Sequence, residues 1–209
     1  MKKCAIITGG EISSYSSLDI SHLRNATIIS ADAGYLHAKK LGLKTNIIIG
    51  DFDSLNEIPK DTDEVISFPK YKDDTDTMLA IKLALERGFD DIEIYGALGN
   101  RLDHTFANIQ ALSYIREKNA KGAIISDSNI IYFIKNESLI IKKKENFSLS
   151  LFSFSERCEG VSIKGVKYIL ENAVISQDFP IGVCNEITQD FCEISVKSGK
   201  MMIIISKIL

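Results

Sequence analysis

The sequence predicts an α/β protein in two parts: a doubly wound, mainly parallel sheet followed by a small all-β domain. Three observations support this. Short β-branched runs alternate with amphipathic stretches over the first 130 residues, and a glycine follows two of those stretches. Beyond about residue 130, short apolar runs continue without convincing helices between them. Strands separated by helices indicate βαβ units, whereas strands separated by turns indicate a sandwich or barrel.

The elements of the first part follow from these patterns. The predicted strands are residues 5–8, 27–30, 46–49, 64–67, 92–95 and 123–126. The predicted helices are residues 34–41 and 76–87, which end before Gly42 and Gly88, and residues 104–118. Glycine after the last helical residue is a common helix stop because it accepts a left-handed conformation.

The second part is predicted to hold only strands. They are residues 130–134, 138–141, 147–152, 168–170, 191–196 and 201–206. No linker rich in proline or glycine marks the boundary, so the domains are assigned as residues 1–130 and 131–209 on the change of pattern alone.

Composition excludes several classes of protein. The chain has 25 Lys and Arg against 28 Asp and Glu, a net charge of −3, so a surface that binds bulk nucleic acid is not expected. No apolar run is long enough for a membrane helix or a signal peptide. The four cysteines lack C-x-x-C spacing, which favours reduced thiols in a cytoplasmic protein.

Polar clusters follow five of the predicted strands directly or closely. They are residues 9–10, 32–34, 50–54, 72–76 and 96–104. Because parallel strands end at one edge of a sheet, these clusters are expected to converge where doubly wound folds bind ligands.

The converging clusters are strongly acidic. They contain Asp32, Asp51, Asp53, Asp73, Asp74 and Asp76, which would repel one another unless a cation or long separations relieved them. Two carboxylates two residues apart in an extended segment point to the same side, and this arrangement suits Mg²⁺. Simpler interpretations remain open, because aspartates also cap helices and populate solvated turns.

Glycines and one arginine add features of an anion site. Gly96 and Gly99 let backbone N–H groups approach an anion at the start of the following helix. Arg101 adds a planar donor suited to phosphate or to orienting a carboxylate. The loop matches neither the Walker pattern nor the full dinucleotide fingerprint, which disfavours a P-loop enzyme or a dehydrogenase.

Taken in order along the chain, these motifs resemble those of the thiamine pyrophosphokinase family. The segments that carry the resemblance are residues 32–34, 50–54, 72–76, 101–104, 165–168 and 182–186, so it spans essentially the whole chain. Single motifs are modest support, whereas the ordered set is strong.

The resemblance implies a fold and a reaction. The fold would be a Rossmann-like catalytic domain that binds ATP and Mg²⁺, followed by a β-sandwich that binds thiamine. The enzyme would be a homodimer with active sites between subunits. It would transfer the pyrophosphoryl group of ATP to the hydroxyethyl group of thiamine, giving thiamine diphosphate and AMP.

The resemblance also implies roles for individual residues. The positions that match Mg²⁺ ligands are Asp51, Asp53 and Asp76, and Asp73, Arg101 and Asp103 complete the catalytic set. The positions assigned to the nucleotide are Asp32, Gly34, Lys72, Thr75, Gly96, Gly99 and Arg101. Those assigned to thiamine are Asp103, Tyr168, Cys184 and Asn185, with Tyr168 stacking on the ring and Asn185 hydrogen-bonding it.

Three residues depart from the family pattern. Ala33 and Asn100 stand where glycines are usual, and Cys184 stands where a serine is usual. Asparagine accepts left-handed conformations better than most residues, so the loop at Asn100 is expected to survive.

Two other classes compete with this interpretation. Residues 47–54 imitate the strand and D-x-D motif of a haloacid dehalogenase phosphatase, but they follow the third strand rather than the first. A non-catalytic nucleotide-binding module is the second alternative, although it would not need so many convergent carboxylates.

Overall fold

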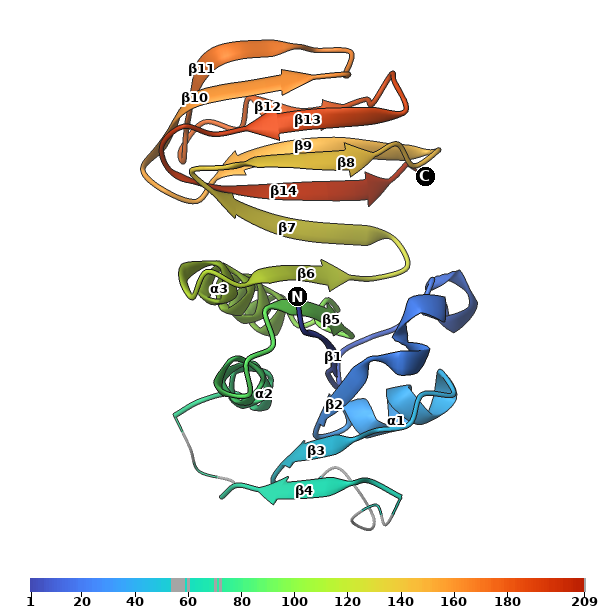
Figure 1. Ribbon diagram of the computed structural model, residues 1–209. Helices are drawn as coiled ribbons and strands as arrows, with labels where there is room; N and C mark the ends of the chain where they lie inside the picture. The colour runs from blue at the N-terminus through green and yellow to red at the C-terminus, as the bar shows by residue number, and fades with distance from the viewer. Residues whose placement is uncertain (54–58, 60, 70, 72, 209) are drawn as a thin grey trace. The chain divides into compact units, whose positions relative to one another are not determined.

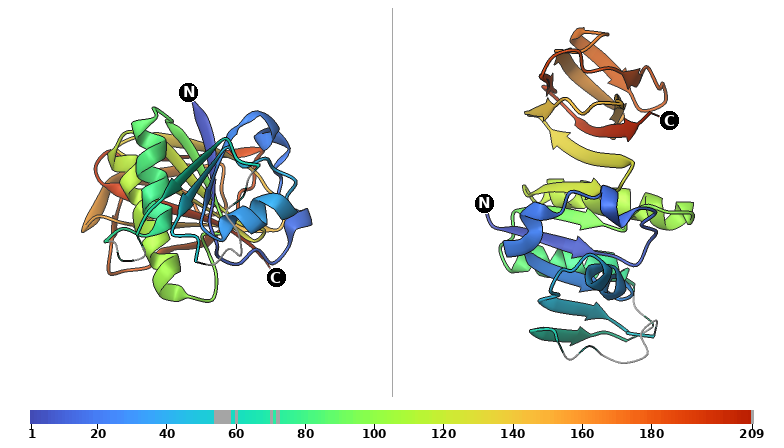
Figure 2. Two further views of the ribbon diagram at one scale, coloured as in Figure 1. Left: turned by 90° about the horizontal axis from the view of Figure 1, so that it is seen from below. Right: turned by 90° about the vertical axis from the view of Figure 1, so that its right-hand side faces the viewer.

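The computed structural model describes residues 1–53, 59, 61–69, 71 and 73–208. The chain forms two compact units, Met1–Asp127 and Ser128–Leu209 (Figures 1 and 2). None of the helices in these described ranges is both long and apolar enough to cross a membrane.

The first unit is built on parallel strands. Within it the strand order is β6-β5-β1-β2-β3-β4, and each neighbouring pair is parallel. The strands are β1 Lys3–Ile7, β2 Thr27–Ala31, β3 Ile47–Gly50, β4 Glu64–Ser67, β5 Asp91–Tyr95 and β6 Lys121–Ile125. All four residues of β3 are buried, and such continuous apolar runs are expected where both faces of a strand are covered.

Helices cover both faces of these strands. The α-helices are α1 Gly34–Lys40, α2 Asp76–Glu86 and α3 Leu102–Glu117, and two 3₁₀ helices span Tyr15–Ser17 and Ser21–Asn25. Figure 1 shows α2 and α3 on one side of the strands and α1 on the other. Because side chains alternate along a strand, Ala5 and Ile7 of β1 share a core cluster with Ala38 of α1.

The second unit is a sandwich of antiparallel strands. One sheet has the order β12-β9-β14-β7 within this unit, and the other is β11-β10-β13-β8. The strands are β7 Asn129–Lys135, β8 Ser138–Lys142, β9 Phe147–Ser153, β10 Arg157–Lys164, β11 Leu170–Ser176, β12 Gly182–Asn185, β13 Phe191–Ser195 and β14 Lys200–Lys207. Side chains from both sheets, such as Leu151, Ile163 and Ile203, share one buried core.

Among the described residues, the larger sheet is mixed, because it contains both parallel and antiparallel strand pairs, and the smaller four-stranded sheet is separate and antiparallel. The expected mainly parallel, Rossmann-like description therefore applies only to strand pairs of the first unit and is wrong for the large sheet. The reason is the connections. Parallel neighbours need long crossovers, usually helices, whereas the strands after α3 are joined by turns and loops that permit antiparallel pairing.

The strand predictions in the second unit were incomplete. The strand expected over residues 168–170 is wrong, because Tyr168 lies in a bend and β11 begins at Leu170. β10 and β12 were not predicted. The pairing of β10 with β11 contains register shifts, and β12 has half-exposed and exposed residues only. Irregular or exposed strands lack the clean apolar alternation on which prediction depends.

Candidate active site

Loops that follow β1, β2, β3 and β5 enclose a cavity of about 600 Å³, together with the first turns of α2 and α3. The predicted site residues on its wall are Asp32, Asp51, Thr75, Asp76, Gly96, Gly99 and Arg101. They converge because parallel strands end at the same edge of the sheet.

Three carboxylates form a close group at this edge. Asp32, Asp51 and Asp53 each offer an oxygen, and these oxygens all lie within 4.8 Å of one another. Asp32 and Asp51 are half-buried, whereas Asp53 is exposed. Like charges this close are unfavourable without a cation, and an all-oxygen donor set suits Mg²⁺. The group thus joins Asp32 to two of the three predicted metal ligands.

The prediction that an extended segment brings Asp51 and Asp53 together is wrong, because a turn does so instead. Strand β3 ends at Gly50, and Phe52 between the two aspartates has a φ of 60°. The Phe52 side chain is buried, and the backbone N–H of Asp53 donates to Asp51 Oδ1 at 3.1 Å. A left-handed conformation is uncommon for a bulky residue, so packing of the Phe52 ring imposes the turn that pairs the carboxylates.

Asp32 also adopts a left-handed conformation. Its φ is 48°, which aspartate accepts more readily than most residues, and its N–H donates to the carbonyl of Ile49 at 2.8 Å. This bond ties the end of β2 to β3 and thereby places Asp32 beside the Asp51 turn.

The other predicted acids have different surroundings. Asp74 and Asp76 line the cavity, but Asp74 is already paired with Lys82 at 2.6 Å. Thr75 caps α2 by accepting a hydrogen bond from the N–H of Met78 at 3.2 Å. Asp73 is exposed and lies outside the described cavity wall. Lys72, predicted to contact the nucleotide, lies outside the described residues.

Glycines at the strand ends permit close backbone packing. A Cβ atom on Gly34 would lie 1.9 Å from the carbonyl oxygen of Ile7. Gly96 has a φ of +67°, and a Cβ there would lie 2.5 Å from the carbonyl oxygen of Thr8. Only glycine fits such positions without a shift of the backbone. Gly34 is not among the described residues of the cavity wall, and its predicted role at the nucleotide stays a prediction.

Arg101 and Asp103 form an exposed pair at the start of α3. Arg101 Nη2 donates to Asp103 Oδ2 at 2.6 Å, and their side chains are 69% and 65% exposed. The hydrogen bond from Arg101 is the main cause that lowers the pKa of Asp103. Arg101 reaches the cavity wall, whereas Asp103 does not.

Several residues of the cavity wall were not predicted as site residues from the sequence. Thr8 and Glu11 flank the two glycines after β1, and Asn108 donates to the carbonyl of Ala97 at 2.8 Å. Asn108 could have been predicted from its spacing. His104, Thr105 and Asn108 lie three, four and seven residues after Arg101, so they share one face of the helix with it.

In the second unit, the structure joins Tyr168 and Asn185. Tyr168 is 63% exposed. Its N–H donates to Asn185 Oδ1 at 3.0 Å, and Asn185 Nδ2 donates to its carbonyl at 2.8 Å. Cys184 is exposed with a φ of 60°, and its N–H donates to Ser150 Oγ at 3.1 Å. The Cys184 contact uses the main chain, so the missing serine hydroxyl does not affect it.

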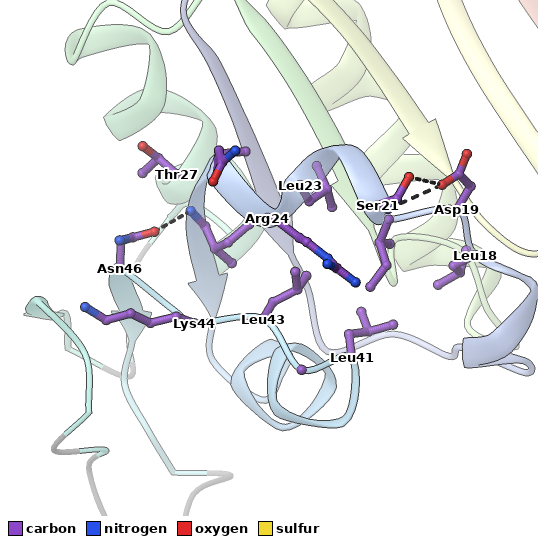
Figure 3. Close-up of a pocket in the computed structure, with 15 residues that line it drawn as sticks. Leu18, Asp19, Ser21, Leu23, Arg24, Thr27, Leu41, Leu43, Lys44 and Asn46 are labelled. Carbon is purple, nitrogen blue, oxygen red and sulfur yellow. Dashed lines mark hydrogen bonds between the residues drawn. The ribbon is translucent and has the colours of Figure 1, made fainter.

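A second cavity, of about 920 Å³, lies at the opposite edge of the first unit's strands (Figure 3). Thr27 at the start of β2 and Asn46 just before β3 belong to its wall, and much of the rest is apolar. Asp19 is its sole carboxylate among the described lining residues, and it accepts a hydrogen bond from Ser21 Oγ at 2.8 Å. Arg24 and Lys44 also line this second cavity. The acid-lined cavity is therefore the better candidate for a metal site.

Comparison with known proteins agrees with the two-part organisation. Residues 21–124 match the family model for the thiamin pyrophosphokinase catalytic domain. Residues 137–201 match that for the thiamin pyrophosphokinase vitamin B1 binding domain.

Individual relatives cover almost the whole chain. Thiamine pyrophosphokinase of Bacillus subtilis is 30% identical over 210 residues, which covers 98% of each chain. A crystal structure of thiamine pyrophosphokinase from Bacillus subtilis superposes with a TM-score of 0.90 at 29% identity, over 100% of both chains. A thiamin pyrophosphokinase family protein from Enterococcus faecalis gives a TM-score of 0.85 at 26% identity, over 99% of both chains. The chain belongs to the thiamin pyrophosphokinase family, whose members are kinases that make thiamine diphosphate.

Proposed function

We propose that this chain transfers the pyrophosphoryl group of ATP to the hydroxyethyl oxygen of thiamine, releasing thiamine diphosphate and AMP. The observation that carries the proposal is the three-carboxylate group at the strand ends, in a chain of this family. A cavity with this charge needs a cation, and the Mg²⁺ that accompanies a nucleoside triphosphate supplies one.

The metal site is proposed at the acid group. Asp51 and Asp53 would hold Mg²⁺, with Asp76 as the third ligand on the family resemblance and Asp32 as a further oxygen donor within reach. Bound Mg²⁺ would offset the negative charge of the triphosphate and of the carboxylates.

The nucleotide phosphates are proposed to meet backbone donors and Arg101. The N–H groups around Gly96 and Gly99 lie just before α3, where the helix dipole favours an anion. Arg101 is held by Asp103 in an exposed ion pair, which is worth little in water. The guanidinium can therefore exchange the carboxylate for phosphate oxygens, where charge grows during the reaction.

In the proposed reaction, the thiamine hydroxyethyl oxygen attacks the β-phosphorus of ATP. The bond from that phosphorus to the bridging α–β oxygen breaks, and AMP leaves. The alcohol's proton goes to a carboxylate or to water. Asp103 and Asp73 are the proposed acceptors, although loose phosphoryl transfer requires little help from a base.

Thiamine is proposed to bind through the second unit, with residues 1–130 as the catalytic domain and residues 131–209 as the thiamine-binding domain. Tyr168 offers an exposed aromatic face to the cationic thiazolium and the aminopyrimidine. Asn185 and Cys184 are assigned to the same region by the family resemblance. A cytoplasmic location remains a prediction.

We also propose a homodimer in which each site takes Asp53 from one chain and Tyr168 from the other, on the family resemblance alone. Asp53→Asn and Tyr168→Ala homodimers should both be poor enzymes. Reassembly of an equal mixture should restore about a quarter of normal activity, because half the dimers are hybrids and each has one intact site. Activity that stays at the parental level, with hybrids demonstrably present, would exclude the composite site.

Product identification tests the function. The protein is incubated with ATP, Mg²⁺ and thiamine, and the products are separated and identified. We expect AMP and thiamine diphosphate in equal amounts. ADP with thiamine monophosphate would refute the proposal. Phosphate release that does not require thiamine would favour the phosphatase alternative, and intact bound ATP would favour the binding module, although family membership favours neither.

A further inference from the structure

The segment that carries Tyr168 is anchored at its base. Val166 forms an antiparallel bridge with Ile187, and both side chains are buried in the core of the second unit. One residue further on, the N–H of Lys167 donates to the carbonyl of Glu186 at 2.9 Å. Backbone pairing and core packing thus fix residues 166 and 167, whereas Tyr168 lies beyond them in an exposed bend.

At Tyr168, the Asn185 side chain takes the place of a neighbouring strand. The main chain of Asn185 pairs with Leu149 of β9. Its side-chain amide accepts from the Tyr168 N–H at 3.0 Å and donates to the Tyr168 carbonyl at 2.8 Å. These are the two hydrogen bonds that the C=O and N–H of one residue on an adjacent antiparallel strand would supply. The amide therefore extends the pairing by one residue and links Tyr168 to β12.

The amide has little capacity left for a ligand. An asparagine side chain has two acceptor positions on its oxygen and two hydrogens on its nitrogen. Asn185 Oδ1 also accepts from the N–H of Glu186 at 2.9 Å, so both acceptor positions and one hydrogen are in use. A single N–H remains to meet a bound molecule.

We propose that Asn185 is a positioning residue that acts on thiamine through Tyr168, by holding the main chain that presents the ring. This rests on the proposed function, in which Tyr168 receives thiamine. Side-chain contacts alone restrain the ring weakly, since the Lys167 ammonium lies 5.8 Å from its centre and is itself shared with Glu186 at 3.8 Å. Fixing the backbone beforehand reduces the ordering cost on binding.

Substitutions at Asn185 should therefore change thiamine binding and little else. Asn185→Ala removes all three hydrogen bonds, and the KM for thiamine should rise about 3- to 10-fold, the range expected for ordering one side chain. The KM for ATP should stay within about twofold, because the ATP site is assigned to the other unit. Asn185→Asp keeps the accepting oxygen but sets a carboxylate oxygen against the Tyr168 carbonyl in place of the donor, so it should also raise the KM for thiamine.

A matched control distinguishes this from general loss of stability. Asn129→Ala removes a hydrogen bond from Ser206 Oγ to Asn129 Oδ1, 2.8 Å long, in the same unit. Asn129→Ala should leave the KM for thiamine unchanged, even if it lowers the melting temperature as much as Asn185→Ala does.

The decisive experiment is a double-mutant cycle with Tyr168→Ala, read as the KM for thiamine. If Asn185 acts through Tyr168, Asn185→Ala should raise that KM less than about twofold in the Tyr168→Ala background. A full, multiplicative effect in that background would overturn the inference and indicate direct contact with thiamine. Should Asn185→Ala fold poorly, the cycle is run with Asn185→Asp.

Amide hydrogen exchange separates this inference from the proposed function. If Tyr168→Ala leaves the KM for thiamine unchanged, the role given to Tyr168 fails. The action of Asn185 on thiamine then fails with it, but the claim that Asn185 holds the Tyr168 main chain is judged separately. It predicts that exchange at the Tyr168 and Glu186 amides is about tenfold faster in Asn185→Ala than in wild type and Asn129→Ala. Unchanged exchange would overturn it.

Discussion

The acid-lined cavity of the first unit and the Tyr168 segment of the second present polar and aromatic groups by opposite means. In the first unit, the turns that follow parallel strands bring carboxylate oxygens to within 4.8 Å of one another. In the second unit, an aromatic ring is left 63% exposed and its main chain is held by a single side-chain amide.

The difference matches the two tasks in the proposed reaction. Phosphoryl transfer depends on charges that are placed before the reaction begins, so carboxylates already gathered in one place suit it. Recognition of a flat cationic ring depends on an accessible aromatic face. Changes in the first unit should therefore affect the rate, and changes in the second should affect the KM for thiamine.

The largest effect is expected for Asp53→Asn. Loss of one metal ligand should reduce kcat by about 10²-fold or more, because stabilisation of the transition state falls by several kcal/mol. The melting temperature should be unchanged or slightly higher, since repulsion within the acid group decreases.

Asp90→Asn is the matched control for Asp53→Asn. Asp90 lies before β5, at the opposite edge of the strands, and its Oδ1 accepts from the N–H of Lys2 at 2.6 Å. Asparagine keeps that acceptor, so kcat should be normal. Near-normal turnover of Asp53→Asn in saturating Mg²⁺ would contradict the metal assignment.

The next effect concerns the packing that supports the cavity. Gly34→Ala places a Cβ 1.9 Å from the Ile7 carbonyl oxygen, which should lower the free energy of unfolding by about 3 kcal/mol, at the upper end for overpacking. Gly42→Ala meets no atom within 4 Å and bears only the strain of its φ of +68°, about 1 kcal/mol. Urea denaturation measures both, and equal losses would show that the packing at Gly34 is not tight.

The first unit was the more predictable from sequence, and the reason is local. Most strands contain a short apolar run, and loop residues such as Asp32 and Gly96 follow directly, so the edge at which they gather follows from parallel pairing. The turn at Phe52 was not predictable, because its left-handed conformation depends on packing of the ring.

In the second unit, the contacts depend on register between distant segments. The Asn185 amide meets Tyr168 17 residues away, across strands whose pairing no local pattern determines. The Tyr168 bend itself was predicted as a strand, because an aromatic residue followed by apolar residues is typical of strands. The family resemblance could assign Tyr168 and Asn185 to the thiamine site, but it could not show that Asn185 hydrogen-bonds the main chain of Tyr168.

Two substitutions at Tyr168 should have a smaller effect, and they test whether thiamine needs an aromatic ring there or only an apolar side chain. Tyr168→Phe keeps the ring and should leave the KM for thiamine within about twofold, whereas Tyr168→Leu should raise it about tenfold, the loss of a cation–π contact. Steady-state kinetics at saturating ATP provides the measurement. Equal effects of the two substitutions would argue against stacking on the ring.

The smallest effect on stability is expected at the Arg101–Asp103 pair. Because Arg101 lowers the pKa of Asp103 below its usual 3.8, the pair contributes to stability above that pH and loses its contribution as the pH falls through the lowered pKa. Arg101→Met should return the pKa of Asp103 to near 3.8, as followed by NMR titration. The melting temperature at neutral pH should hardly change, because both side chains are exposed.

The fate of individual phosphorus atoms tests the central claim most directly. ATP labelled at the α-phosphorus or at the β-phosphorus is incubated with Mg²⁺ and thiamine, and the label is followed into the separated products. Transfer of the pyrophosphoryl group predicts that α-label appears only in AMP and β-label only in thiamine diphosphate. If the β-label were instead found in ADP, with thiamine monophosphate as the other product, the chain would be a simple kinase and the account would be wrong.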